Sequence, residues 1–154
     1  MADEAVTKLN AQIVFMPMQY PEDVKAAKKI VAKMKQPACV LKEDFTTREL
    51  MSLVGNMDLM IGIRLHALIF AGVMGTPMIG ISYDPKIDRF LKSIDEDVVG
   101  DLENVTVEAL MQEINAKWNN KEIYRNQNLK RMAKLRSLAR SNAEMALEFI
   151  DKNK

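Results

Sequence analysis

The chain of 154 residues contains one cysteine and one histidine. A single cysteine excludes an intramolecular disulfide framework and a zinc site built from several cysteines, and it fits a reducing compartment. We expect Cys39 to be a small core residue. Neither charge sign dominates, since 22 Lys and Arg stand against 21 Asp and Glu. The net charge of +1 therefore gives no overall electrostatic reason to expect a nucleic-acid partner, and we predict none. We also predict no metal site.

Long apolar runs are also missing. No stretch approaches the roughly 18 residues needed to cross a bilayer, and the start, MADEAVTKLNAQ, lacks the basic and apolar segments of a secretory signal. We expect a cytoplasmic protein. What is present is 48% hydrophobic residues, enough to bury the core of one ordinary domain. The twelve methionines lie within periodic apolar segments, where methionine commonly fills gaps in a core.

Short apolar runs alternate with helical patterns along the chain. The strand-like runs are 13–18, 38–41, 58–63, 77–82 and 98–100, and helices are predicted over 21–34, 46–57, 65–74, 86–94 and 107–118. Strands that are apolar on both faces and separated by helices are typical of a parallel sheet covered on both sides. We predict an α/β fold, a Rossmann-like doubly wound parallel sheet with a C-terminal helical tail. It forms a single domain over 1–154, with its core at about 11–120 and its tail at about 121–150.

The stretch GIRLHALIFAGVMGTPMIGISYDPK holds two successive junctions between a strand and a helix. Ligands of parallel α/β sheets bind at the carboxyl ends of strands, beside the N-termini of the following helices. Arg64, Leu65 and His66 fall at the first junction. The Arg64 guanidinium is a planar fork suited to carboxylate or phosphate, and an imidazole exchanges a proton near neutral pH. The alternatives are a buried structural imidazole and an ion pair of Arg64 with Asp58 or Asp84.

The second junction places Tyr83, Asp84 and Lys86 after the next strand. If the two strands are neighbours, Lys86 approaches the same anion as Arg64. Two cations, a helix start and one imidazole then suit a small, multiply charged anion. We interpret Gly72 and Gly75 as close-packing and helix-ending residues, because GVMG ends a helix instead of opening one.

The run DLMIGIRLHALIFAGVMGTPMIGISYDPKIDRFL, in which RLHA is followed by GISYDPK, resembles the polysaccharide pyruvyl transferases of the CsaB type. The resemblance covers roughly residues 10–94 and is to the C-terminal half of those enzymes. It implies the C-terminal domain of a two-domain, glycosyltransferase-B-like fold, without its N-terminal domain and inactive alone. The reaction it implies moves the pyruvyl unit of phosphoenolpyruvate onto two hydroxyls of a sugar, forming a ketal and releasing phosphate. Phosphoenolpyruvate is the donor substrate, and no cofactor is expected.

The resemblance also implies roles for the junction residues. His66 is the expected catalytic residue, and the expected substrate-binding residues are Arg64, Leu65, Tyr83, Asp84 and Lys86. The implied acceptor is a lipid-linked amino sugar of a cell-wall polysaccharide precursor, whose pyruvylation serves to anchor S-layer proteins. The alternative function is the nucleotide-sugar-binding half of a glycosyltransferase-B-type glycosyltransferase or epimerase. A receiver-like signalling domain is set aside, because the first and third strands do not end in acidic residues.

The tail is basic. Between Lys121 and Arg140 there are seven basic residues and one acidic residue. Its expected apolar face consists of Ile123, Leu129, Met132, Leu135 and Leu138. We favour a core-packing helix with a solvated basic side over peripheral adhesion to the inner face of the cell membrane. Aromatic residues are not interleaved with the basic ones as a nucleic-acid stacking surface requires.

Overall fold

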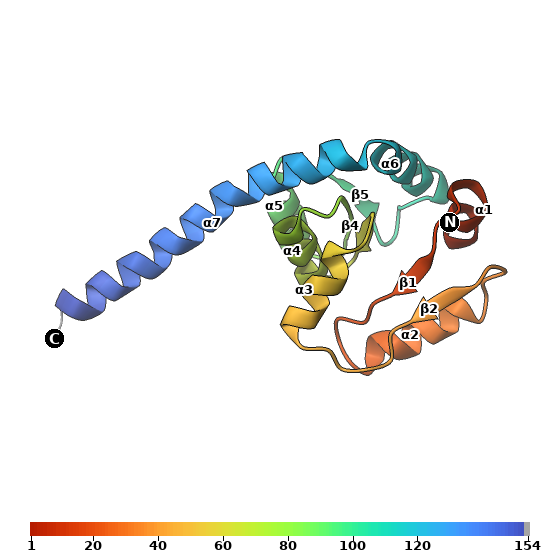
Figure 1. Ribbon diagram of the computed structural model, residues 1–154, viewed down its shortest axis with the longest axis horizontal. Helices are drawn as coiled ribbons and strands as arrows, with labels where there is room; N and C mark the ends of the chain where they lie inside the picture. The colour runs from red at the N-terminus through yellow and green to blue at the C-terminus, as the bar shows by residue number, and fades with distance from the viewer. Residues whose placement is uncertain (153–154) are drawn as a thin grey trace.

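The computed structural model describes residues 1–152, in which five strands alternate with seven helices (Figure 1). The strands are β1 (Ile13–Phe15), β2 (Ala38–Val40), β3 (Met60–Gly62), β4 (Met78–Ser82) and β5 (Val98–Asp101). The helices are α1 (Ala2–Leu9), α2 (Glu22–Val31), α3 (Thr47–Gly55), α4 (Leu65–Met74), α5 (Pro85–Ser93), α6 (Val107–Asn119) and α7 (Lys121–Lys152). Each strand and helix predicted from the sequence is present, with ends displaced by a few residues at most.

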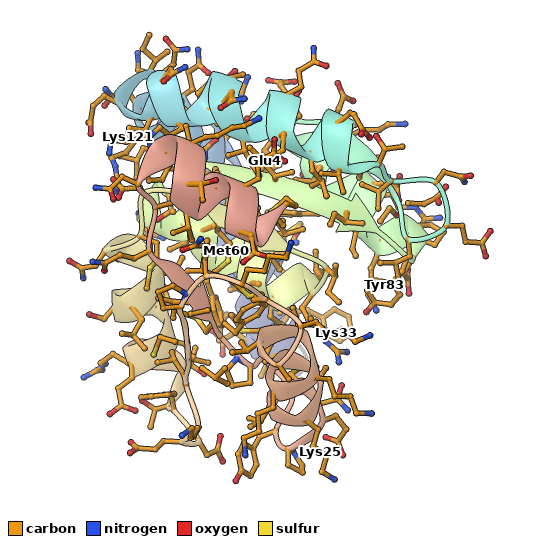
Figure 2. The ribbon with its side chains drawn as sticks, turned by 90° about the vertical axis from the view of Figure 1, so that its right-hand side faces the viewer. Glu4, Lys25, Lys33, Met60, Tyr83 and Lys121 are labelled. Carbon is orange, nitrogen blue, oxygen red and sulfur yellow. The ribbon has the colours of Figure 1, made fainter. Side chains whose placement is uncertain are left out.

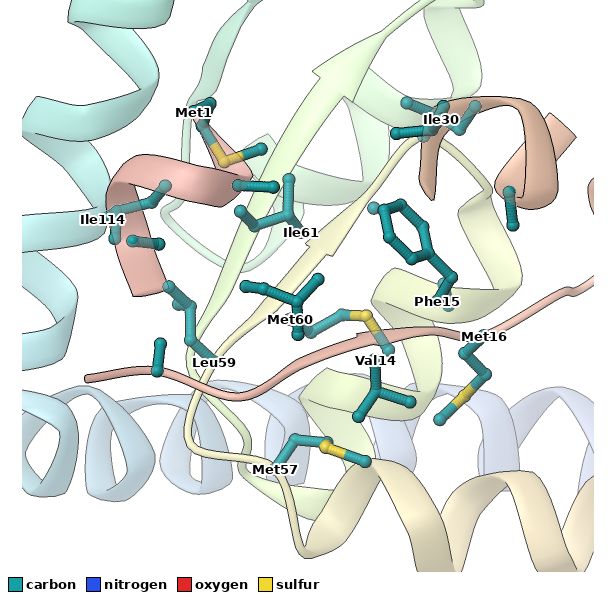
Figure 3. Close-up of a pocket in the computed structure, with 18 of the residues that line it drawn as sticks. Met1, Val14, Phe15, Met16, Ile30, Met57, Leu59, Met60, Ile61 and Ile114 are labelled. Carbon is teal, nitrogen blue, oxygen red and sulfur yellow. The ribbon is translucent and has the colours of Figure 1, made fainter. Parts of the chain in front are cut away.

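All paired strands run parallel, as predicted, but they form two sheets instead of one. β1 pairs with β2, and the second sheet has the order β3-β4-β5. The division falls between β1 and β3, which both line an apolar cavity. Figure 3 shows Phe15 of β1 and Met60 of β3 at this gap. A cavity lined by side chains therefore lies where a continuous sheet has backbone hydrogen bonds.

Helices cover both faces of the larger sheet, as predicted for a parallel sheet of an α/β fold. All five residues of β4 are buried. Met78 belongs to a core cluster with residues of α3, α4, α5 and α7, whereas Ile79 and Ile81 belong to a second cluster with α6. Alternate residues of one strand thus serve opposite layers, because successive side chains of a strand point to opposite faces.

Local signals set the ends of the helices near the site. Thr46 and Glu49 form a capping box at the start of α3. Gly75 ends α4 in the left-handed region, with φ of 77°, as predicted for a helix-ending glycine. A Cβ on Gly72 would lie 2.9 Å from the sulfur of Met132, so this glycine permits the close approach of α4 and α7.

The long helix α7 packs on the domain over its first half only. Asn128 and Met132 are buried, and Leu135 packs against the core cluster. All of residues 136–152 are exposed, and α7 extends away from the domain (Figure 1). The predicted apolar face is therefore wrong for Ile123, Leu129 and Leu138, which are 46–57% exposed. In residues 1–152, no helix is both long and apolar enough to traverse a bilayer.

Cys39 is exposed, so its predicted place in the core is wrong. It lies on β2, an edge strand of a sheet with only two members. The neighbouring residues Ala38 and Val40 are half-buried. Because side chains of a strand alternate between faces, Cys39 falls on the face that remains uncovered.

Candidate functional site

The two junctions predicted to form a site lie at the carboxyl ends of neighbouring strands of the larger sheet. β3 and β4 are direct neighbours, with Gly62 opposite Gly80. Because parallel strands end at the same side, the segments after β3 and β4 emerge next to each other. The condition on which the predicted anion site depended, that these strands be neighbours, is met.

Arg64 is the residue that precedes the first turn of α4. Its side chain is one-third exposed, and its Nη2 donates to Oδ1 of Asp23 at 2.8 Å. Oδ2 of Asp23 also accepts the backbone N–H groups of Met18 and Gln19, at 3.0 and 2.9 Å. Partial burial acts to raise the pKa of Asp23, but these hydrogen bonds outweigh it and the pKa is lowered. Asp23 thus fixes Arg64 relative to the segment between β1 and α2.

Arg64 forms an ion pair with an aspartate, as one alternative expected, but the aspartate is Asp23 and not Asp58 or Asp84. Asp58 lies 2.6 Å from Lys121, and Asp84 lies 3.2 Å from Lys86. Sequence reasoning missed Asp23, which is 41 positions from Arg64. The only local signal was its place in the first turn of a predicted helix, where an acidic residue is ordinary.

Tyr83 connects the second junction with the first. Nζ of Lys86 lies 5.6 Å from the centre of the Tyr83 ring. The pKa of Lys86 is raised mainly by Asp84, and the pKa of Arg64 is raised mainly by Asp23. Tyr83 contributes to the raised pKa of both residues. One phenol therefore lies near both cations. It is 45% exposed, and Figure 2 shows it at the carboxyl end of the sheet.

Asp84 orients the start of α5. Its Oδ1 accepts the backbone N–H of Lys86 at 2.9 Å, and Oδ2 pairs with the side chain of the same residue. The backbone hydrogen bond from Lys86 is the main cause of the lowered pKa of Asp84. Asp84 is thus an N-cap that also holds the Lys86 ammonium.

His66 lies exposed on the first turn of α4, and its ring centre is 6.5 Å from that of Phe70. The alternative of a buried core imidazole is therefore wrong. Leu65 packs its side chain against the core cluster, so its backbone N–H is the group it presents at the helix start. Thr46, Asp84 and Thr106 cap α3, α5 and α6 with their side chains, whereas Arg64 does not cap α4. The first N–H groups of α4 thus have no side-chain acceptor from the N-cap residue.

A parallel α/β domain with two cations and an uncapped helix start at adjacent strand ends has the features of an anion-binding domain. In residues 1–152 no three His, Cys, Asp or Glu side chains are grouped to hold a metal ion. The sequence profile of the family described as polysaccharide pyruvyl transferase matches residues 2–85, more than half of the chain. The chain belongs to this family of transferases. No curated protein and no solved structure matches it.

Proposed function

We propose that this chain is the C-terminal, glycosyltransferase-B-like half of a CsaB-type enzyme that transfers pyruvyl from phosphoenolpyruvate to a sugar of a cell-wall polysaccharide precursor. The observation that supports the proposal is the adjacency of β3 and β4, because Arg64 and the exposed His66 follow the first of these strands and Tyr83 and Lys86 follow the second. The family match reaches Pro85 and so includes all of these residues except Lys86.

The donor fits this charge arrangement. Phosphoenolpyruvate carries a carboxylate and a phosphate on adjacent carbons, and both anions need cationic or N–H partners. Arg64 pairs with a planar anion through its fork, and Lys86 supplies a point charge. The uncapped N–H groups at Leu65 and His66 are further donors for an anion at the start of α4. Asp23 and Asp84 act as positioning residues, because each holds one of the two cations.

The transfer places a proton on the methylene carbon of the donor and produces positive charge at the adjacent carbon. One sugar hydroxyl adds there. The bond from this carbon to the phosphate oxygen then breaks, and phosphate leaves with the electron pair. The second hydroxyl closes the ketal. Of the two hydroxyl protons, one ends on the new methyl group and the other on phosphate. His66 is the residue of this site suited to move them.

The other parts of the proposal concern the whole enzyme. An N-terminal domain supplies the opposite wall of the cleft, and this chain alone does not turn over substrate. The acceptor is a lipid-linked amino sugar, reached at the inner face of the cell membrane, and its pyruvylation serves S-layer anchoring. These features follow from the CsaB-type resemblance of the RLHA and GISYDPK elements.

The test joins this chain to the upstream half encoded by its gene and measures phosphate release from phosphoenolpyruvate with a sugar acceptor. His66→Ala is expected to lower kcat by at least about 100-fold, as for loss of a general acid or base. Arg64→Ala is expected to raise KM for the donor. Lys92→Ala, an exposed lysine in the last turn of α5, is the matched control and leaves the rate unchanged.

Full activity of both site variants would show that the site is elsewhere. A ligand titration separates the proposal from the glycosyltransferase alternative. Phosphoenolpyruvate is expected to displace a bound fluorescent donor analogue, and a UDP-sugar is not. The reverse order of affinities would favour the nucleotide-sugar function.

A further inference from the structure

A cavity of about 380 Å³ lies between the two sheets, under α1. Figure 3 shows side chains from β1, α2, β3 and α6 lining it, and the cavity is partly open to solvent. Its wall is largely apolar and includes Phe15, Ile30, Met57, Met60, Ile61 and Ile114. This volume and lining fall in the range of small-molecule sites, roughly 300–1,000 Å³ and mainly hydrophobic.

The cavity lies where the predicted continuous sheet is interrupted. In residues 1–152, β1 is hydrogen-bonded to β2 and β3 to β4, and the facing edges of β1 and β3 both line the cavity. Protein interiors are normally packed as densely as organic crystals. An apolar space of this size that is open to solvent leaves its lining atoms facing water, and an apolar ligand that fills it removes them from water and packs against them.

One part of the wall is polar. Asp23 and Arg64 are among the lining residues, and Nη2 of Arg64 is paired with Asp23. Nε of the same guanidinium is buried and has no hydrogen-bond partner among the described residues. Nε is covered by protein atoms, but the Arg64 side chain as a whole is one-third exposed and is the only cationic side chain among these lining residues, so its guanidinium suits an acidic group.

We propose that this cavity binds the hydrocarbon chain of an amphipathic molecule whose acidic head group accepts hydrogen bonds from the partly exposed guanidinium of Arg64. The hydrocarbon chain supplies contacts between β1 and β3, and the head group binds N–H groups of the Arg64 guanidinium other than the Nη2 donor held by Asp23. A carboxylate and a phosphate head share this chemistry. The hydrocarbon chain lies between the sheets, whereas the head group uses Arg64, so this inference shares Arg64 with the site of the proposed function and is tested apart from it by the cavity variants.

Trp118 provides the readout, since it lines the cavity and is the one tryptophan of the chain. The protein is titrated, below the critical micelle concentration, with myristate, myristyl phosphate, myristyl alcohol and inorganic phosphate. We expect saturable changes in Trp118 fluorescence with both acidic amphiphiles, and about tenfold weaker binding of the alcohol, which lacks a charged acceptor. The tighter of the two acidic ligands identifies the head group. Inorganic phosphate is expected to leave the fluorescence unchanged.

Ala5→Leu and Ala27→Leu test the place of binding, because both alanines are buried and line the cavity from different helices, α1 and α2. Each added side chain takes up cavity volume and is expected to weaken binding of myristate at least tenfold. Ala133→Leu, at an exposed position of α7 outside the cavity, is the matched control and binds as the parent chain does. The second cavity variant keeps the test valid if the first fails to fold.

The proposal is overturned if no saturable change occurs with either acidic amphiphile, or if the alcohol binds as tightly as they do. Equal affinity of the cavity variants and the Ala133→Leu control would likewise place the ligand elsewhere. A rise in Tm with myristate in the parent chain but not in folded Ala27→Leu would support it.

Discussion

Glu96 and Lys117 form a buried ion pair whose two members we expect to differ in their importance for stability. Nζ of Lys117 lies 2.5 Å from Oε2 of Glu96 and 2.7 Å from the carbonyl oxygen of Met78. The two side chains are 8% exposed or less. Arg131 holds the other carboxylate oxygen of Glu96 at 2.7 Å. Glu96 therefore has two cationic partners, whereas Lys117 pairs with one carboxylate.

The two single substitutions leave different groups without a charged partner. Glu96→Gln leaves the Lys117 ammonium buried with neutral acceptors, and breaking a buried pair in this way costs about 3–5 kcal/mol. Lys117→Met removes the ammonium but leaves Glu96 paired with Arg131. The main interaction lost in this variant is the hydrogen bond to the carbonyl of Met78, and the free energy of unfolding is expected to fall by about 1–3 kcal/mol. The double variant is expected to lose less than the sum, because the second substitution no longer isolates a buried charge.

Urea unfolding at pH 7, followed by circular dichroism, measures these differences. Glu103→Gln, an exposed carboxylate in the turn after β5, is the matched control and should lie within about 0.5 kcal/mol of the parent chain. The reasoning is refuted if Glu96→Gln costs no more than Lys117→Met, or if the two losses are simply additive.

Four further outcomes are expected. Thr46→Ala removes the capping box of α3 and should cost about 1 kcal/mol in urea unfolding; an unchanged midpoint would contradict this. Gly75→Ala should lower Tm, because φ is 77° and the added Cβ would lie 2.8 Å from Leu129 Cγ. The pKa of Asp23 is below its ordinary 3.8, so its stabilisation is present above that pH and lost as the pH falls through the folded-state value. Asp23→Asn should therefore unfold less steeply with acid below pH 3.8 than the parent chain, and parallel acid curves would refute the contribution. Removal of residues 141–152, all exposed, should change the free energy of unfolding by less than about 1 kcal/mol, and a larger loss would show that α7 is covered along its length.

The alternation of strands and helices could be predicted because it depends on local periodicity, and the two junctions because they depend on residue types next to each other. The adjacency of β3 and β4 was a condition of the predicted site; the structure meets it, in keeping with the usual pairing of successive strands. The pairing of Asp23 with Arg64 could not be predicted, since an acidic residue in a first helical turn has no sequence mark of a distant partner. The division of the sheet between β1 and β3 could not be predicted either, because it depends on how side chains such as Phe15 and Met60 pack in three dimensions.

The exposure of His66 links the chemistry of the site to the proposed second domain. Proton transfer to a carbon through an oxocarbenium-like state needs a site from which bulk water is excluded, because water would capture the cation in place of the sugar hydroxyl. Asp23 and Asp84 hold Arg64 and Lys86 within this chain, so under the proposed function these two cations are positioned without a second wall. His66 has no such cover. We therefore expect the isolated chain to bind phosphoenolpyruvate weakly in equilibrium dialysis and to release no phosphate, with release restored by the N-terminal domain. Phosphate release by the chain alone would show that His66 needs no covering wall.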